Sequence, residues 1–162
     1  MAAVFNFQEV YEIGIQIEQN GLAFYRHFSS KAKDDKAKKV LRELALWEEK
    51  HFELFTKLRN EEAVKLSGVE PIDQNGEAAA YLRSLADSHV FLRSFDLDDM
   101  SRELHSDKLV LQKALHFEKD SVKLYESLLD NMPDEFGKEA VRRLAEEEIK
   151  HVEMITHELA SL

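Results

Sequence analysis

Apolar residues recur every three or four positions along four long segments of the chain, with polar residues between them. This spacing predicts amphipathic helices that each turn one face toward a core. The helices run from about residue 6 to 30, from 34 or 35 to beyond 58, from about 106 to 130, and from 133 almost to 162. Asp34 or Asp35 can cap the second helix, and Pro133 suits the first turn of the fourth. We expect an all-α protein with one domain over residues 1–162.

The segment between the second and third long helices spans residues 61–105 and has a weaker pattern. Residues 77–93 predict a shorter helix, and Asp96 is placed to cap another short turn. A connection of this length is typical of a four-helix bundle in which one link crosses the length of the bundle. We therefore expect a helical hairpin at 5–60, a crossover, and a second hairpin at 106–162.

One arrangement of two glutamates and one histidine occurs twice, one hundred positions apart. Each copy is a lone Glu followed thirty positions later by Glu-x-x-His, and the two copies are Glu18, Glu48 and His51, and Glu118, Glu148 and His151. Superimposing residues 15–56 on 115–156 without a gap also aligns Tyr25 with Tyr125. Unrelated amphipathic helices would share apolar spacing but not these polar residues. We interpret the chain as a duplicated helical hairpin.

The thirty-residue interval has a geometric meaning. Its midpoints are residues 33 and 133, where the predicted turns lie. At a rise of 1.5 Å per residue, both glutamates of a hairpin lie ~20 Å below the turn, at the same height. Residues three apart, such as Glu48 and His51, share a helix face. The two hairpins therefore supply the ligand set with which a four-helix bundle holds two metal ions.

The chemistry of this ligand set favours a redox metal. Carboxylates and neutral imidazoles together suit iron, manganese or zinc. Without metal, four converging carboxylates would raise one another's pKa values, whereas two divalent ions would neutralise them. Two ferric ions and an oxo or hydroxo bridge would balance the same ligands. We therefore expect two iron ions, with zinc or manganese as possible substitutes.

Several residues near the lone glutamates have two possible roles. Tyr25 and Tyr125 lie seven positions after Glu18 and Glu118, within about 20° of the ligand direction. They either pack in the core or donate hydrogen bonds that hold ligand carboxylates in place. The small residues one turn from the same glutamates serve helix packing or leave room for dioxygen or peroxide, and they are Gly14, Gly21, Ala114 and Ser121.

The other histidines lack a ligand partner at helical spacing or lie on the far side of their helices. We expect none of them to bind the metals; they are His27, His89, His105, His116 and His157. Trp47 is expected to pack against neighbouring side chains. The basic cluster at residues 31–39 is a solvated turn or, alternatively, a docking surface for an acidic electron donor.

Composition narrows the classes of protein further. The chain carries 22 Lys and Arg against 32 Asp and Glu, a formal net charge of −10, which argues against nucleic-acid binding. The lack of cysteine excludes disulfides, iron–sulfur clusters and a Cys-ligated iron site. No apolar stretch approaches the ~20 residues that span a bilayer, and the first residues do not resemble a signal peptide. We expect a cytoplasmic protein without membrane partners.

With this motif pair, the chain resembles the rubrerythrin-like proteins of the ferritin-like di-iron carboxylate superfamily over residues 5–60 and 105–160. The resemblance implies a ferritin-like bundle in which Glu48 and Glu148 bridge the two metals. It also implies that each metal is completed by one further Glu and one His, namely Glu18 and His51 for one metal and Glu118 and His151 for the other. Members of this family reduce hydrogen peroxide or dioxygen, or oxidise ferrous iron.

The chain departs from many rubrerythrins in two ways. Its length and its lack of cysteine leave no place for a rubredoxin domain among these residues, so we expect a separate donor such as a rubredoxin to supply electrons. Ser121 stands where many rubrerythrins carry an extra ligand Glu. We expect a di-iron oxidoreductase that reduces peroxide or dioxygen as a homodimer, with no catalytic side chains beyond the ligands. The alternatives are a ferroxidase or iron-handling protein, and a bundle in which the metals are structural.

Overall fold

The computed structural model describes residues 7–66, 77–89, 95–132 and 137–162, and these residues form helices and contain no strand. The four long helices are α1 (Phe7–Lys31), α2 (Asp35–Leu66), α6 (Asp107–Asn131) and α7 (Lys138–Ala160). Two shorter helices, α3 (Glu77–Ser88) and α5 (Leu97–Glu103), lie between α2 and α6 in the sequence. The predicted all-α class is confirmed.

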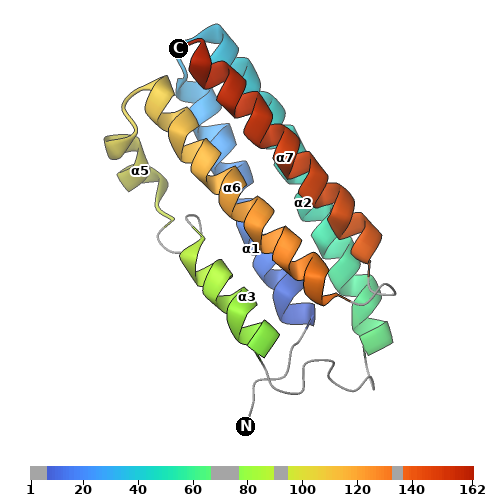
Figure 1. The fold of residues 1–162 in the computed structure, drawn as a ribbon. Helices are drawn as coiled ribbons and strands as arrows, with labels where there is room; N and C mark the ends of the chain where they lie inside the picture. The colour runs from blue at the N-terminus through green and yellow to red at the C-terminus, as the bar shows by residue number, and fades with distance from the viewer. Residues whose placement is uncertain (1–6, 67–76, 90–94, 133–136) are drawn as a thin grey trace.

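The four long helices pack side by side as a bundle (Figure 1). Helix α1 packs against α2, α6 packs against α7, and α2 contacts α7 across the bundle. Helix α3 packs on α6, so the segment between the hairpins covers one side of the bundle. Each pair of consecutive long helices therefore forms one half of the bundle, and both halves face a shared interior.

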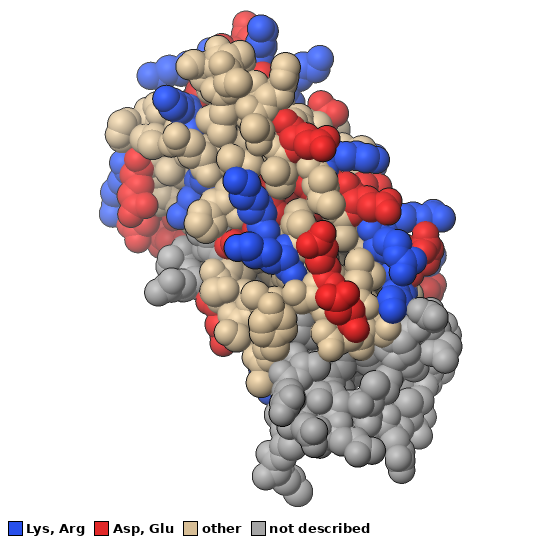
Figure 2. Space-filling model, viewed as in Figure 1, with Lys and Arg blue, Asp and Glu red and all other residues tan. Residues whose placement is uncertain are grey.

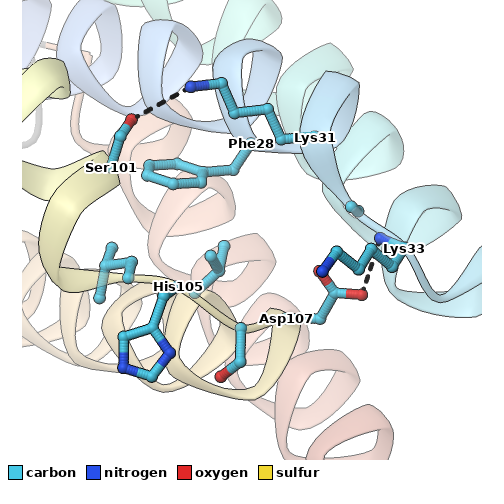
Figure 3. A pocket seen from close by; sticks show the side chains of 10 residues that line it. Phe28, Lys31, Lys33, Ser101, His105 and Asp107 are labelled. Atoms are coloured by element: carbon cyan, nitrogen blue, oxygen red, sulfur yellow. Dashed lines mark hydrogen bonds between the residues drawn. The ribbon is translucent and has the colours of Figure 1, made fainter.

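The turn between α1 and α2 falls at the predicted place, around residue 33. The side chain of Asp34 accepts a hydrogen bond from the Ala37 N–H at 2.8 Å and so caps α2. Asp107, in the first turn of α6, accepts a hydrogen bond from the backbone N–H of Lys33 at 2.9 Å (Figure 3). It also accepts one from the backbone N–H of Asp34 at 2.7 Å. The second hairpin thus fixes the turn of the first.

Two predicted helix boundaries differ from the structure. Helix α7 begins at Lys138, five positions after the predicted start at Pro133, which lies outside the described residues. Gly137 precedes the helix with φ = 73°, a left-handed conformation that cannot continue into a right-handed helix. Helix α3 ends at Ser88, short of the predicted residue 93. The predicted cap at Asp96 is confirmed, because its side chain accepts the N–H groups of the first turn of α5.

The core is built from equivalent positions of the two hairpins. Residues that match across the repeat are buried in both copies, among them Phe24 with Leu124, Tyr25 with Tyr125, Phe28 with Leu128 and Leu44 with Leu144. Fully burying one such apolar side chain contributes about 1.5–3 kcal/mol. The sequence repeat therefore coincides with a repeat in packing, and the interior it encloses also holds the predicted metal ligands.

The surface shown in Figure 2 carries acidic and basic side chains in an interspersed arrangement. On this face, the described residues form no continuous basic area of the kind that follows a nucleic-acid backbone. None of the described helices is long and apolar enough to cross a membrane.

Candidate metal centre

Six acidic and imidazole side chains from the four long helices meet inside the bundle, at the positions that the repeat predicts. The four carboxylates are 0% exposed and the two imidazoles 2% exposed. We call this set the Glu/His cluster, and it consists of Glu18 on α1, Glu48 and His51 on α2, Glu118 on α6, and Glu148 and His151 on α7. Side chains of this kind are almost never fully buried unless they are paired or coordinate a metal.

The cluster divides into two overlapping groups of four residues, and the ligand atoms within each group lie within 4.8 Å of one another. One group joins Glu18 and His51 to the shared pair Glu48 and Glu148, and the other joins Glu118 and His151 to the same pair. Only these two groups occur among the described residues. The carboxylates of Glu48 and Glu148 are thus the two that both groups share.

Both histidines turn the same ring nitrogen toward the carboxylates. The Nδ1 atom of His51 lies 3.3 Å from Glu18 and 3.2 Å from Glu148. The Nδ1 atom of His151 lies 2.9 Å from Glu148 and 3.5 Å from Glu118. In this orientation, the Nε2 atom of each ring points away from the cluster carboxylates that Nδ1 contacts.

The atoms that face the middle of the cluster include buried atoms without a hydrogen-bond partner. They are Oε2 of Glu18, both carboxylate oxygens of Glu48, Nδ1 of His51, Oε2 of Glu118 and Oε1 of Glu148. Leaving buried acceptors unsatisfied costs about 1–3 kcal/mol each, and more for charged groups. Metal ions between the two groups would supply the missing partners, so the donor set fits two metals of the kind that bind carboxylate and imidazole.

Two tyrosines tie the hairpins together through the lone glutamates. Tyr25 on α1 donates its hydroxyl hydrogen bond to Glu118, and Tyr125 on α6 donates to Glu18. Burial, together with the adjacent carboxylates, raises the pKa of both phenols well above the ordinary value. Both tyrosines therefore remain protonated donors at neutral pH and orient the carboxylates, as the second of the two sequence interpretations proposed.

Without metal, the cluster retains protons. Burial and the charge of Glu148 raise the pKa of Glu118 to about 8. Burial alone would lower the pKa of His151, but hydrogen bonds to Glu118 and Glu148 raise it to about 10. Opposed effects act on Glu148, where burial raises the pKa but His51 and His151 lower it overall. Protons thus take the place of cations between the carboxylates.

Metal affinity is expected to rise with pH between about pH 6 and 8, because a metal ion must displace the protons on Glu118 and His151. Below the pKa of a ligand group, metal affinity rises about tenfold per pH unit for each proton that the metal must displace. Calorimetric titration of the metal-free protein with Co²⁺ in buffers of different ionisation enthalpy counts the released protons. An affinity that does not change over this range would contradict the prediction.

Glu147 is a functional candidate that the sequence did not reveal. Its carboxylate lies 2.9 Å from Nε2 of His51, on the side of the ring opposite the cluster. The hydrogen bond to His51 lowers the pKa of Glu147. A carboxylate in this position fixes the ring orientation of a metal-binding histidine and raises its basicity.

The two hairpins differ at the position that Glu147 occupies. The repeat matches Glu147 with Trp47, so a carboxylate in one hairpin corresponds to an indole in the other. The Trp47 ring lies 6.3 Å from the His51 ring and 5.9 Å from the His151 ring, centroid to centroid. Trp47 packs beside both imidazoles, as expected, but supplies no carboxylate. The imidazole of His51 should therefore be the more basic ligand.

Replacing Glu147 by Gln is expected to weaken one of the two metal-binding steps by about 10- to 100-fold, because His51 loses its carboxylate partner. Stepwise titration with Co²⁺, followed by visible absorption, measures both steps. The neighbouring exposed residue provides the control, Glu146→Gln, which should change neither. Equal weakening of both steps in Glu147→Gln would contradict the inequivalence of the two sites.

Gly14 and Gly21, the two glycines near the cluster, allow close packing between helices. A Cβ atom at Gly21 would lie 2.5 Å from Oε2 of Glu48 and 2.8 Å from the ring of Phe117. A Cβ atom at Gly14 would lie 2.9 Å from the ring of Phe55. The space that these glycines leave is therefore filled by protein, and it offers no room for an oxidant.

None of the five remaining histidines belongs to either ligand group. His27 contacts Ser101 through Nε2 at 2.7 Å, and His116 is 67% exposed near Asp120. His89 differs from the others, because it is fully buried and contacts Ser121. No pattern in the sequence predicts this contact, since the two residues belong to different helical segments.

A cavity of about 190 Å³ opens at the α1–α2 turn, away from the Glu/His cluster (Figure 3). Lys31 and Lys33 from the basic cluster line one side of it, and Ser101 and Asp107 line the other. None of the six predicted ligands lines this cavity. Part of the basic cluster thus packs against α5 and α6, where Lys31 approaches Ser101 at 3.4 Å.

Comparison of the chain with protein-family models, curated proteins and solved structures finds no match. The functional interpretation therefore rests on the geometry and chemistry of the Glu/His cluster.

Proposed function

We propose that the protein binds two iron ions and reduces hydrogen peroxide or dioxygen with electrons from a separate donor protein. The observation that supports this most strongly is the Glu/His cluster, where six ligands predicted from a sequence repeat meet inside the bundle with partnerless atoms between them. Two divalent ions would neutralise the four carboxylates. The same carboxylate and imidazole donors would also suit iron in its ferric state.

In this proposal, Glu48 and Glu148 would be shared by the two metals, and one further Glu and one His would complete the hold on each metal. When bound, two ferrous ions supply the two electrons that reduce an O–O bond. The protein's own part is to fix the ligands and exclude bulk water. Tyr25 and Tyr125 hold the terminal carboxylates by hydrogen bonds, and Glu147 holds the ring of His51.

We infer a ferritin-like arrangement of two duplicated hairpins joined by a crossover. It is supported by the pairing of α1 with α2 and of α6 with α7, and by the burial of equivalent positions in both pairs. The shorter helices α3 and α5 belong to the connecting segment, and α3 lies along α6. The site needs side chains from all four long helices, so neither hairpin could form it alone.

Stopped-flow mixing of the anaerobic, ferrous-loaded protein with peroxide or dioxygen tests the proposed reaction. At least one oxidant should oxidise the bound iron faster than it oxidises free ferrous iron. A reduced rubredoxin should then return the centre to the ferrous state and give repeated turnover. If neither oxidant reacts faster than with free iron, the oxidoreductase proposal is wrong.

Ferroxidase activity in iron handling is the second candidate, and Ser121 favours it. Serine at this position leaves six ligands, the set also typical of ferritin-type oxidase centres. Assembly size separates the candidates, because iron storage needs a large hollow shell whereas peroxide reduction fits a homodimer. A purely structural role would instead give a centre that binds zinc as well as iron and shows no turnover.

A further inference from the structure

A buried polar pair lies beside the Glu/His cluster on one side only. Nε2 of His89 and Oγ of Ser121 are 3.0 Å apart, and both residues are 0% exposed. Ser121 lies on α6, one turn beyond Glu118, and His89 directly follows the last residue of α3. The ring of Phe117 packs edge-on against His89, with centroids 5.3 Å apart. Helix α3 thus brings an imidazole to the α6 side of the bundle.

The hydroxyl of Ser121 differs from other serine hydroxyls in these helices. Those of Ser30, Ser88 and Ser101 donate to a carbonyl of the preceding turn, at 2.6, 2.9 and 2.7 Å. Such back-bonding is the usual local solution for serine in a helix. Ser121 instead bonds to His89, its only side-chain hydrogen-bond partner within the described residues. The imidazole therefore holds this hydroxyl away from the helix backbone.

The repeat indicates where position 121 faces. It matches Ser121 with Gly21, where an added Cβ would lie 2.5 Å from the carboxylate of Glu48. By analogy with Gly21, we infer that position 121 on α6 lies beside the carboxylate of Glu148, whose charge acts on His89, the partner of Ser121. Ser121 thus puts a hydroxyl group at the edge of the cluster, in the half where His89 supports it. The other half has no side chain at this place.

The protonation state of His89 suits a positioning role. Burial lowers its pKa to about 4, against the opposing influence of Asp120 and Glu148. The ring is therefore neutral at pH 7. A neutral imidazole that donates through Nε2–H leaves the proton of a serine hydroxyl available for another acceptor.

We propose that Ser121 donates a hydrogen bond to a small anion or peroxide bound at the α6 side of the metal centre, and that His89 positions its hydroxyl. This inference rests on the proposed metal function and adds a ligand contact to it. Ser121 is the group that touches the ligand. His89 acts through Ser121 and is a positioning residue.

Azide binding to the Co²⁺-loaded protein tests the inference without relying on activity. Visible absorption of Co²⁺ reports both metal content and azide affinity. Ser121→Ala and His89→Phe are expected to keep two Co²⁺ ions per chain and to bind azide about tenfold more weakly, the effect of one lost hydrogen bond to an anion. His89→Gln, which retains a donor, should recover part of the affinity.

The chain supplies a control in His27 and Ser101, a histidine–serine contact of 2.7 Å between residues outside both ligand groups. His27→Phe and Ser101→Ala should leave azide affinity unchanged. Full azide affinity in Ser121→Ala, or loss of Co²⁺ from that variant, would overturn the inference, as would a Co²⁺-loaded wild-type protein that does not bind azide. If His89→Phe does not fold, Ser121→Ala alone decides. A wild-type protein that holds no Co²⁺ would overturn the proposed metal function itself.

Discussion

Replacing Glu48 and Glu148 together by Gln is expected to abolish metal binding while the helical fold persists. Both carboxylates belong to both ligand groups, so their loss leaves each metal with one Glu and one His. Burial raises the pKa of Glu48 well above normal in the metal-free protein. Gln at position 48 therefore replaces a carboxyl whose neutral form is already favoured by burial.

Replacing Glu148 by Gln removes a negative charge from the core, and we expect the protein to remain folded without it. Glu148 accepts a hydrogen bond from Nδ1 of His151 and lies 3.2 Å from Nδ1 of His51, and it helps to raise the pKa of each histidine. Gln at position 148 removes that charge, so the buried histidines should shift toward their neutral form. Circular dichroism should still show a helical protein, and any loss of stability should be visible in the metal-free state.

Iron content after anaerobic ferrous loading and desalting measures the main effect. The wild-type protein should hold two ions per chain and the double variant none. Binding at 100 times the dissociation constant adds about 2.7 kcal/mol of stability, so loading should raise the melting temperature of the wild-type protein only. Glu49→Gln with Glu146→Gln, on the same helices but outside both ligand groups, is the matched control. Unchanged iron content in the Glu48, Glu148 variant would refute the ligand assignment.

Gly21→Ala is expected to destabilise the protein and to disturb the metal centre from the backbone side. The added methyl group would lie 2.5 Å from Oε2 of Glu48 and 2.8 Å from the ring of Phe117, shorter than real contacts of a Cβ atom. Overpacking of this kind costs about 1–3 kcal/mol. Alanine gains about 1 kcal/mol in a helix interior. Because both neighbours are themselves buried, we expect the overpacking to exceed the gain.

Comparison with Gly14→Ala distinguishes the effect of helix crowding on stability from the effect of Gly21→Ala on the metal centre. Its added methyl group would lie 2.9 Å from the ring of Phe55, an apolar neighbour outside the ligand set. Urea denaturation of the metal-free proteins should show reduced stability in both variants. Metal affinity should fall only in Gly21→Ala, since only there must a bridging carboxylate move. Wild-type metal affinity in Gly21→Ala would contradict the close approach of Glu48 to α1.

The sequence could predict where the six side chains of the Glu/His cluster meet, because helical geometry is local and regular. The thirty-residue interval fixes the height of each Glu below its turn, and the i, i+3 spacing fixes which side chains share a face. The turn near residue 33 and the burial of Tyr25 and Tyr125 follow from the same periodicity.

Contacts between segments distant in the sequence could not be predicted in this way. Glu147 reaches His51 across the α2–α7 interface, and no spacing within one helix encodes that approach. His89 meets Ser121 only because α3 packs on α6. The start of α7 was predicted too early because the left-handed conformation of Gly137 depends on the connection as a whole.

Anomalous diffraction from crystals of the ferrous-loaded protein, measured at the iron absorption edge, tests the proposed di-iron centre most directly. Two peaks about 3.5–4 Å apart, the usual separation in two-metal sites, are expected inside the bundle between Glu48 and Glu148. One peak should adjoin Nδ1 of His51 and the other Nδ1 of His151. A fully loaded crystal with no peak in the cluster, or with a single peak there, would contradict a two-metal centre.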